Sequence, residues 1–325
     1  MDWVRSLLGL LSFLFALGAL GGSLIAQGGR LSAQLDVLTH LVPLYLVFAG
    51  IGAGLAFAAP RGARTGLLLL SVVALLAAGA LIAPEILRRP RVEPQAVRAP
   101  GQLKVIQFNA WGQNAKAAEA VAWILRQEAD VVVVQEAGRV RDPLLSAGYH
   151  ASCLSCGAVV FSRVEPVGRY AEPKREGGQR SLLSSSTLRT QAGVFSVVGI
   201  HRHWPVRFAK EASQTEDLRA YLATLPKGRL ILAGDFNSTP WSFARQREDR
   251  EFGLLRRTIM LPTWPAETVS HNRLPAPFPY MPIDHVYAGP GWTTVSVELG
   301  PRLGSDHYPV VVTLTPSPPV ADPPT

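Results

Sequence analysis

The chain has 325 residues, with 32 Lys and Arg against 24 Asp and Glu and a formal net charge of +8. This length accommodates one large domain and an appendage. The hydrophobic fraction is 48% and the charged fraction only 17%, which argues against an entirely soluble enzyme. The basic balance favours a polyanionic partner, namely nucleic acid, a phosphorylated small molecule or an anionic membrane surface, without selecting among them.

The apolar residues are concentrated in three uncharged runs, residues 6–29, 37–60 and 65–84. Each run is long enough to cross the hydrocarbon core, which takes about 20 residues, and none keeps a polar face. We therefore predict three transmembrane helices within residues 1–87 and an integral protein of the plasma or inner membrane. His40 in the second run is interpreted as an interfacial histidine. A cleaved signal peptide is the alternative for the first run, but no clean cleavage site follows it.

The membrane face of the C-terminal part is left open by two opposing signals. Three spans put the two ends of the membrane region on opposite faces, and arginines flank both, with a small excess after the third run that favours the cytoplasm. The only cysteines, Cys153 and Cys156, form a Cys-x-x-Cys pair without a second pair for a metal site. A local disulfide between them would indicate an oxidising compartment, and two free thiols are the alternative.

After the membrane region, the sequence changes character. Residues 88–101 are basic and Pro-rich, which is typical of a linker whose arginines can contact anionic headgroups. Strands and helices then alternate, which predicts an α/β domain over residues 102–315. Residues 316–325 form a Pro-rich tail that we expect to be disordered. The predicted strands are residues 103–108, 131–134, 157–161, 194–200, 229–233, 283–287 and 310–314, and the predicted helices are residues 115–127 and 211–225.

Polar residues recur where these strands end. Taken singly, each has an ordinary interpretation, because an Asp or Asn after a strand is usually part of a turn and a lone His is usually buried and satisfied. Side chains at the ends of strands in one rigid sheet can nevertheless be gathered into one site. The ordered set is the stronger indication: Asn109, Gln135, Glu136, His201, Asp235, Asn237, Asp284, His285, Ser305, Asp306 and His307.

This order resembles the endonuclease/exonuclease/phosphatase superfamily with its deoxyribonuclease I-like fold. The most specific segments are LAGDFNSTPWS at residues 232–242 and GSDHYPVVV at residues 304–312. The segments QFNAWG, VVVVQEAG and GIHRHWP support them in the expected order. The resemblance covers nearly all of residues 103–315. It implies two mixed β-sheets packed as a four-layer α/β/β/α sandwich, with the active site at one edge.

The resemblance also implies a metal site. Glu136 is the primary ligand in this interpretation, Asp306 joins it, and Asn109 serves as a ligand or a positioning residue. Oxygen ligands suit Mg²⁺ or Mn²⁺, and either ion can neutralise the negative charge that develops on phosphate oxygens.

The remaining roles follow from the chemistry of phosphate-ester hydrolysis. Asp235 and Asn237 lie two residues apart on an extended segment and so face the same side, where the carboxylate orients water and the amide contacts a phosphoryl oxygen. His307 is the general base or polarises the phosphate, and Asp284 pairs with it. His201 assists from the opposite side. The expected reaction is in-line attack by water without a covalent intermediate.

Some positions depart from the family pattern or have an ordinary alternative. In deoxyribonuclease-like members, the equivalent of His201 pairs with an acid on a neighbouring strand, but residues 179–187 contain none, which weakens a general-acid role for His201. Arg180 is a candidate phosphate contact or a surface arginine. His203 is a candidate to share the site, and Trp264 is a candidate substrate contact or a packing residue.

The leading prediction is a divalent-metal-dependent phosphodiesterase of the endonuclease type, acting on a phosphate ester of nucleic acid or of a phospholipid headgroup. A lipid phosphodiesterase of the sphingomyelinase type or a phosphatase is the first alternative, and a catalytically silent membrane-anchored binding module is the second. The bilayer is a partner through the three helices, and no protein partner is inferred. The helix centres lack charged residues, which disfavours a transporter.

Overall fold

The computed structural model describes residues 2–88, 92–93, 99–173, 182–269 and 274–317. Contacts divide the chain into two units, one of Met1–Arg89 with Ser238–Glu248 and one of Pro90–Asn237 with Asp249–Thr325. The sequence contains no signal for the assignment of Ser238–Glu248 to the first unit. Much of the predicted linker, nearly all of the predicted tail, and Arg180 lie outside the described residues.

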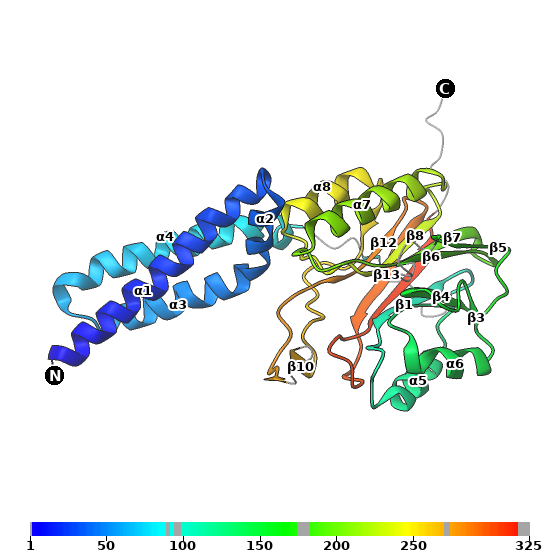
Figure 1. Cartoon of the computed structure of the whole chain (residues 1–325), viewed down its shortest axis with the longest axis horizontal. Helices are drawn as coiled ribbons and strands as arrows, with labels where there is room; N and C mark the ends of the chain where they lie inside the picture. The colour runs from blue at the N-terminus through cyan, green and yellow to red at the C-terminus, as the bar shows by residue number, and fades with distance from the viewer. Residues whose placement is uncertain (1, 89–91, 94–98, 174–181, 270–273, 318–325) are drawn as a thin grey trace, which may run out of the picture. The chain divides into compact units, whose positions relative to one another are not determined.

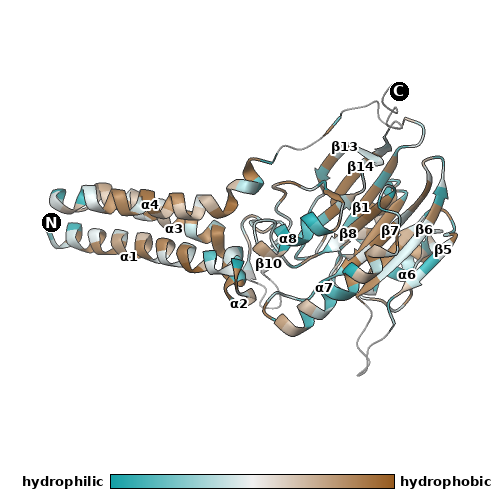
Figure 2. Cartoon of the chain, turned by 90° about the horizontal axis from the view of Figure 1, so that it is seen from above, coloured by the Kyte–Doolittle hydropathy of each residue, from teal (hydrophilic) through white to brown (hydrophobic). Residues whose placement is uncertain are grey.

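The first unit contains three long apolar helices, as the hydropathy of the sequence predicts. They are α1 (Asp2–Ala26), α3 (Val42–Ala58) and α4 (Arg61–Ile86), which pack side by side and are apolar along their lengths (Figures 1 and 2). All three are long and apolar enough to cross a membrane.

The packing of these helices reverses that of a water-soluble bundle. Small residues such as Ala16, Ala49 and Ala74 are fully buried between the helices, whereas Leu14 is 53% exposed and Leu76 is 68% exposed. Small residues let helix backbones approach closely in lipid, and large apolar side chains on the outside have no favourable partner in water. The distribution is compatible with insertion in a membrane.

The connection between α1 and α3 is made of short helical turns, η1 (Gln27–Arg30), α2 (Ala33–Asp36) and η2 (Val37–Leu41). We call residues 27–41 the interhelical cap. The predicted second apolar run therefore begins in these turns, and its long helix begins only at Val42. Pro43 lies in the first turn of that helix, where a missing N–H costs no hydrogen bond.

The second unit is built on two six-stranded sheets. The first sheet has the order β13-β14-β1-β2-β4-β3, with β1 (Leu103–Asn109), β2 (Val131–Gln135), β3 (His150–Ala151), β4 (Ala158–Ser162), β13 (Trp292–Leu299) and β14 (Val310–Pro316). The second has the order β5-β6-β7-β8-β12-β9, with β5 (Gly168–Ala171), β6 (Leu183–Thr190), β7 (Gly193–His201), β8 (Leu230–Asp235), β9 (Leu255–Arg256) and β12 (Asp284–Ala288). A short ribbon pairs β10 (Thr268–Val269) with β11 (Leu274–Pro275), and the helices are α5 (Ala117–Arg126), α6 (Gly138–Ser146), α7 (Phe208–Ala223) and α8 (Phe243–Glu251).

The two sheets pack face to face with helices on their outer sides, which confirms the predicted α/β/β/α sandwich. Val105 and Val133 of the first sheet meet Val197 and Ile231 of the second in one apolar core. Helices α5 and α6 both cover the outer face of the first sheet. Helix α7 covers the outer face of the second sheet. Strands covered on both faces are apolar at every position, which explains the run of four valines in β2.

Strand register brings the predicted polar residues to one edge of the sandwich. Asn109 pairs with Gln135 where parallel β1 and β2 end, and His201 pairs with Asp235 where parallel β7 and β8 end. Antiparallel β12 then places Asp284 opposite Asp235.

Strand β6 was absent from the sequence prediction. Its sequence LSSSTLRT lacks the apolar alternation that indicates a strand, yet Ser184 and Ser186 are fully buried. The Ser184 hydroxyl donates to the Ala158 carbonyl at 2.8 Å, so the burial of this hydroxyl is satisfied by a contact that no local pattern shows. Strand β13 was missed as well, although WTTVSVEL has β-branched residues typical of a strand.

Gly234 tests how closely the two central strands of the second sheet approach. A Cβ at this position would lie 2.0 Å from the Ile200 carbonyl oxygen, a backbone atom that cannot move aside cheaply. We expect Gly234→Ala to destabilise the second unit by about 3 kcal/mol, which lowers its melting temperature by about 6–12 °C. Thermal unfolding followed by circular dichroism measures the effect, with Gly228→Ala as the control because no heavy atom lies within 4 Å of its added Cβ. Equal melting temperatures for the two variants would contradict the close approach.

Candidate active site

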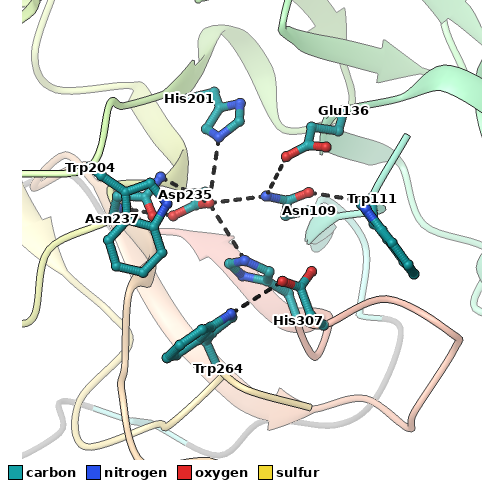
Figure 3. Close-up of a pocket in the computed structure, with 10 residues that line it drawn as sticks. Asn109, Trp111, Glu136, His201, Trp204, Asp235, Asn237, Trp264 and His307 are labelled. Atoms are coloured by element: carbon teal, nitrogen blue, oxygen red, sulfur yellow. Dashed lines mark hydrogen bonds and ion pairs between the residues drawn. The ribbon is translucent and has the colours of Figure 1, made fainter. Parts of the chain in front are cut away.

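A polar pocket of about 90 Å³ lies at the edge where the strands of the second unit end (Figure 3). This volume is close to the share of about three water molecules in liquid water, so the pocket has room for one small polar group. Its lining contains seven of the polar residues singled out from the sequence together with three tryptophans, of which Trp264 was also singled out. The lining residues are Asn109, Trp111, Glu136, His201, Trp204, Asp235, Asn237, Trp264, Asp306 and His307.

Asp235 lies at the centre of the pocket, with nitrogen atoms on several sides (Figure 3). Its Oδ2 atom accepts a hydrogen bond from Asn109 Nδ2 at 3.0 Å. The same oxygen lies 3.6 Å from His201 Nε2 and 3.7 Å from His307 Nε2. Burial of this carboxylate raises its pKa to about 6, because desolvation outweighs the attraction of the two histidines. Asp235 is thus largely ionised at neutral pH but close to its titration range.

His307 and Asp284 form a buried pair beside Asp235. His307 Nδ1 lies 2.8 Å from Asp284 Oδ2, and Gln107 Nε2 donates to Asp284 Oδ1 at 2.8 Å. Burial acts to lower the pKa of His307, but the charges of Asp284 and Asp235 outweigh it and raise that pKa to about 10. Burial acts to raise the pKa of Asp284, and the positive His307 outweighs it, so that pKa is lowered. The pair is an imidazolium and a carboxylate at neutral pH.

Glu136 and Asp306 also line the pocket and supply further carboxylate oxygens. Both are partly exposed. Glu136 Oε2 accepts the Gly112 N–H at 3.3 Å, and Asp306 Oδ2 accepts the Trp264 indole N–H at 3.3 Å. Carboxylate oxygens of this kind fit Mg²⁺ or Mn²⁺. The buried group of Asp235, Asp284 and His307 also has one possible ligand atom from each residue within 4.8 Å of the others, but His307 Nδ1 and Asp284 Oδ2 are already joined by a hydrogen bond.

Two amide side chains position the carboxylates. Asn109 Nδ2 faces both Asp235 and Glu136, the latter at 3.4 Å, while its Oδ1 accepts the Trp111 N–H at 3.2 Å. The Asn237 backbone N–H donates to Asp235 Oδ1 at 2.8 Å, and its Nδ2 donates to the Arg202 carbonyl at 2.8 Å. Because the amide nitrogens are used within the protein, this geometry favours positioning roles for both residues over direct phosphate contact.

Three pocket residues have a left-handed backbone conformation. The φ angles are 53° at Trp111, 51° at Glu136 and 49° at Asn237. This conformation is uncommon for residues other than glycine and concentrates at functional sites. Glu136 and Asn237 each follow the end of a strand, so the turn in the backbone directs the chain sharply away from the sheet while the side chain stays at the pocket.

The remaining predicted residues have different placements. His203 is outside the pocket lining, and its backbone N–H donates to Gln214 Oε1 at 2.9 Å. Trp264 lines the pocket but is only 6% exposed, and its indole contacts Asp306. The family pattern places an acid near His201 on a neighbouring strand, but residues 182–187, the described part of that region, contain none. The carboxylate that lies near His201 is Asp235.

The sequence analysis missed Gln107, which organises the site, and it singled out Ser305 without giving it a role. Gln107 lies on β1 and bridges Asp284 and Gln135 Oε1, the latter at 2.7 Å. The Ser305 hydroxyl donates to the Asn109 carbonyl at 2.6 Å and accepts the His307 N–H at 3.1 Å. A buried amide inside the apolar segment KVIQF was the available signal for Gln107. For Ser305 it was the position beside Asp306 and His307.

Comparison with known proteins shows the family of the chain. A family model described as the Endonuclease/Exonuclease/phosphatase family matches residues 106–307, which is more than half of the chain. The chain therefore belongs to this family, whose members are in general phosphoesterase hydrolases that use divalent metals. A search of curated proteins finds no match.

Solved structures share the fold of the second unit. An endonuclease/exonuclease/phosphatase from Beutenbergia cavernae is 23% identical with a TM-score of 0.52, over 66% of this chain and 72% of that chain. The protein SmcL is 18% identical with a TM-score of 0.54, over 67% of this chain and 100% of that chain. The human nocturnin catalytic domain, solved with a bound sulfate anion, is 18% identical with a TM-score of 0.51, over 70% of this chain and 99% of that chain. At these identities the likeness concerns the fold alone.

The raised pKa of His307 gives a direct test of the site. Because it lies above the ordinary value of 6.5, protonation of His307 stabilises the fold fully below pH 6.5, and this stabilisation is lost as the pH rises through about 10. In the metal-free protein in EDTA, we expect the His307 imidazole to stay charged through neutral pH. We expect Asp284→Asn to lower its pKa. NMR spectra of the imidazole nitrogens against pH measure both, and a wild-type ring that titrates near 6.5 would contradict the pairing.

Proposed function

We propose that this protein is a membrane-anchored, divalent-metal-dependent phosphodiesterase of the endonuclease-like type, which hydrolyses its substrate by in-line attack of water. The observation that carries the proposal is the pocket itself. A buried carboxylate, Asp235, lies within 4 Å of nitrogens from Asn109, His201 and His307. Two further carboxylates, Glu136 and Asp306, face the same small space. This combination can orient a water molecule and balance the charge of a phosphate at once.

Mg²⁺ or Mn²⁺ would be held by Glu136 and Asp306, with Asn109 fixing the orientation of Glu136. When bound, the ion neutralises charge on the phosphoryl oxygens. Among the residues that line the pocket, no cationic side chain lies within hydrogen-bond distance of either carboxylate. Among these residues, their oxygens therefore have no positively charged partner that would compete with a metal ion.

The protein groups divide the proton chemistry according to their charge. Asp235, with a pKa of about 6, accepts a hydrogen bond from the attacking water and directs it at phosphorus. His307, held positive by Asp284, donates from Nε2 to a phosphoryl oxygen and so polarises the phosphate. The raised pKa of His307 makes it a poor general base at neutral pH. Of the two roles expected for it, this favours polarising the phosphate. His201, on another side of Asp235 (Figure 3), is the donor to the leaving oxygen.

The three long apolar helices would anchor the enzyme in a bilayer, and its substrate would be a phosphate ester of nucleic acid or of a phospholipid headgroup. A lipid phosphodiesterase is the second candidate, supported by aromatic residues near the pocket. The Trp204 ring is 41% exposed and lies 5.7 Å from the Trp264 ring, whose other neighbour Tyr280 is 39% exposed. Exposed aromatic rings of this kind suit stacking on bases or contact with a lipid interface.

Metal dependence tests the proposed function. The full chain in detergent micelles should hydrolyse bis-p-nitrophenyl phosphate with Mg²⁺ or Mn²⁺, and EDTA should abolish the activity reversibly. Glu136→Ala removes the proposed principal metal ligand, and His307→Ala removes the hydrogen-bond donor to the phosphoryl oxygen. Each should therefore lower kcat by about 10²–10⁴-fold. Glu119→Ala, an exposed carboxylate in the first turn of α5, is the matched control and should retain full activity.

The same preparation separates the alternatives. Preference for DNA over sphingomyelin would support the endonuclease-like function, and the reverse would support the lipid candidate. Full activity of both Glu136→Ala and His307→Ala would contradict the assignment of the site. Wild-type protein inactive on diesters, monoesters, DNA and sphingomyelin would favour the silent binding module.

A further inference from the structure

The segment Ser238–Glu248 begins one residue after the active-site turn at residues 235–237, yet its contacts group it with the helices of the first unit. The segment packs in the apolar cluster of these helices, and its hydrogen bonds described below are made with the interhelical cap, residues 27–41. A connection of this kind is unexpected if the membrane helices serve only as an anchor. It rests on three independent sets of hydrogen bonds between buried groups.

The first contact is a carboxylate at the beginning of α8. Asp36 Oδ1 accepts the Phe243 N–H and Asp36 Oδ2 accepts the Ala244 N–H, each at 2.8 Å. The first N–H groups of a helix have no partner within the helix, and a negative charge there also interacts favourably with the helix dipole. A capping side chain normally comes from the residue just before the helix. Ser242 makes such a contact, since its Oγ accepts the Arg245 N–H at 3.1 Å. Asp36 adds a second cap from 207 residues before Phe243 in the chain, and it is only 5% exposed.

The second and third contacts fix the residues before α8. His40 Nδ1 lies 2.7 Å from Thr239 Oγ1 and accepts the Thr239 N–H at 3.3 Å. The Trp241 indole N–H donates to the Thr39 carbonyl at 2.8 Å. Trp241 is 2% exposed and belongs to the same apolar cluster as Tyr45 of α3. His40, predicted from the sequence as an interfacial residue, therefore has a specific partner.

The cap itself is shaped for this contact. A Cβ at Gly29 would lie 2.6 Å from the Asp36 Cα atom, so glycine is required for the turns to fold against each other. The Arg30 guanidinium lies 4.8 Å from the centre of the Phe243 ring, a cation–π distance. The polar Ser238–Glu248 segment could not enter the hydrocarbon core without a large cost, so the cap that binds it lies at the membrane surface.

The peptide chain carries this restraint into the active site. Ser238 follows Asn237 directly. The Asn237 backbone N–H donates to Asp235, and its side-chain amide donates to the Arg202 carbonyl. Asn237 is 4% exposed and has a φ of 49°, a strained conformation that persists only where its surroundings hold it.

We infer that the interhelical cap is a positioning element for the active site: Asp36, His40 and Thr39 hold Ser238–Glu248, and this segment holds Asn237 and through it Asp235. The inference rests on the proposed function, since it concerns the rate of that reaction. It assigns to the membrane region a part in catalysis beyond anchoring, with Asp36 as the principal positioning residue.

The test uses the full chain in detergent micelles with two readouts. One is kcat and KM for bis-p-nitrophenyl phosphate, and the other is the rate of trypsin cleavage after Arg245 and Arg247, which lie within the segment. Asp36→Ala should lower kcat by about ten- to a hundredfold, with KM changed much less, and should accelerate cleavage. Asp36→Asn, which keeps one acceptor oxygen, should fall between Asp36→Ala and the wild type.

Two further variants guard against simple misfolding. Trp241→Phe keeps an aromatic ring but removes the indole N–H together with part of the buried ring system, and it should produce the same effects in weaker form. Gln34→Ala changes an exposed residue of the cap and should match the wild type in both readouts. The melting temperature of the sheet-containing unit should be equal in all variants.

The outcomes are separable. Asp36→Ala with wild-type kcat overturns the inference, whether or not the segment becomes sensitive to trypsin. A fall in kcat without faster cleavage also overturns it, because the effect would then not pass through the segment. Wild-type protein without any phosphoesterase activity would contradict the proposed function instead. Trypsin protection in the wild type, lost in Asp36→Ala, would in that case still show that the cap holds the segment.

Discussion

The site depends on one constraint, the burial of a negative charge at Asp235. A carboxylate that is 1% exposed is costly unless neighbouring groups donate hydrogen bonds or carry positive charge. Asn109, His201 and His307 supply nitrogens around it. The register of β1, β7 and β8 brings Asn109 and His201 to the strand ends, and His307 comes from the loop before β14. The same burial raises the pKa of Asp235 and keeps the carboxylate within the range where it can exchange a proton.

The electrostatics of the neighbouring pair follow from the same burial. His307 is flanked by Asp284 and Asp235 and is held positive, while Asp284 is held negative by His307. Coupled groups of this kind separate into donors and acceptors. In the proposed mechanism, Asp235 would therefore accept a hydrogen bond from water and His307 would donate one to phosphate. The hydrogen bond from Gln107 to Asp284 keeps that carboxylate in place without adding charge.

One short segment of chain, Ser238–Glu248, follows the active-site turn directly and contacts the cap of the apolar helices. The helices bury small residues and expose large apolar ones, which is compatible with insertion in lipid. Their cap offers a carboxylate, a histidine and a carbonyl to Ser238–Glu248. An enzyme with this connection would be sensitive to anything that alters the cap, including the lipids around it. A soluble relative would need other contacts to hold the equivalent of Asn237.

Hydropathy and local periodicity determined much of this protein from its sequence. Uncharged runs indicated the three long helices, apolar runs indicated the buried strands, and polar residues at strand ends identified most of the pocket lining. These properties depend on neighbours in the chain. Tertiary structure alone decided the pairing of β6, the contacts of Gln107 and the carboxylate nearest His201. It alone decided the contact of Asp36 with α8, because groups 207 residues apart leave no periodic trace in a sequence and meet only when the whole chain has folded.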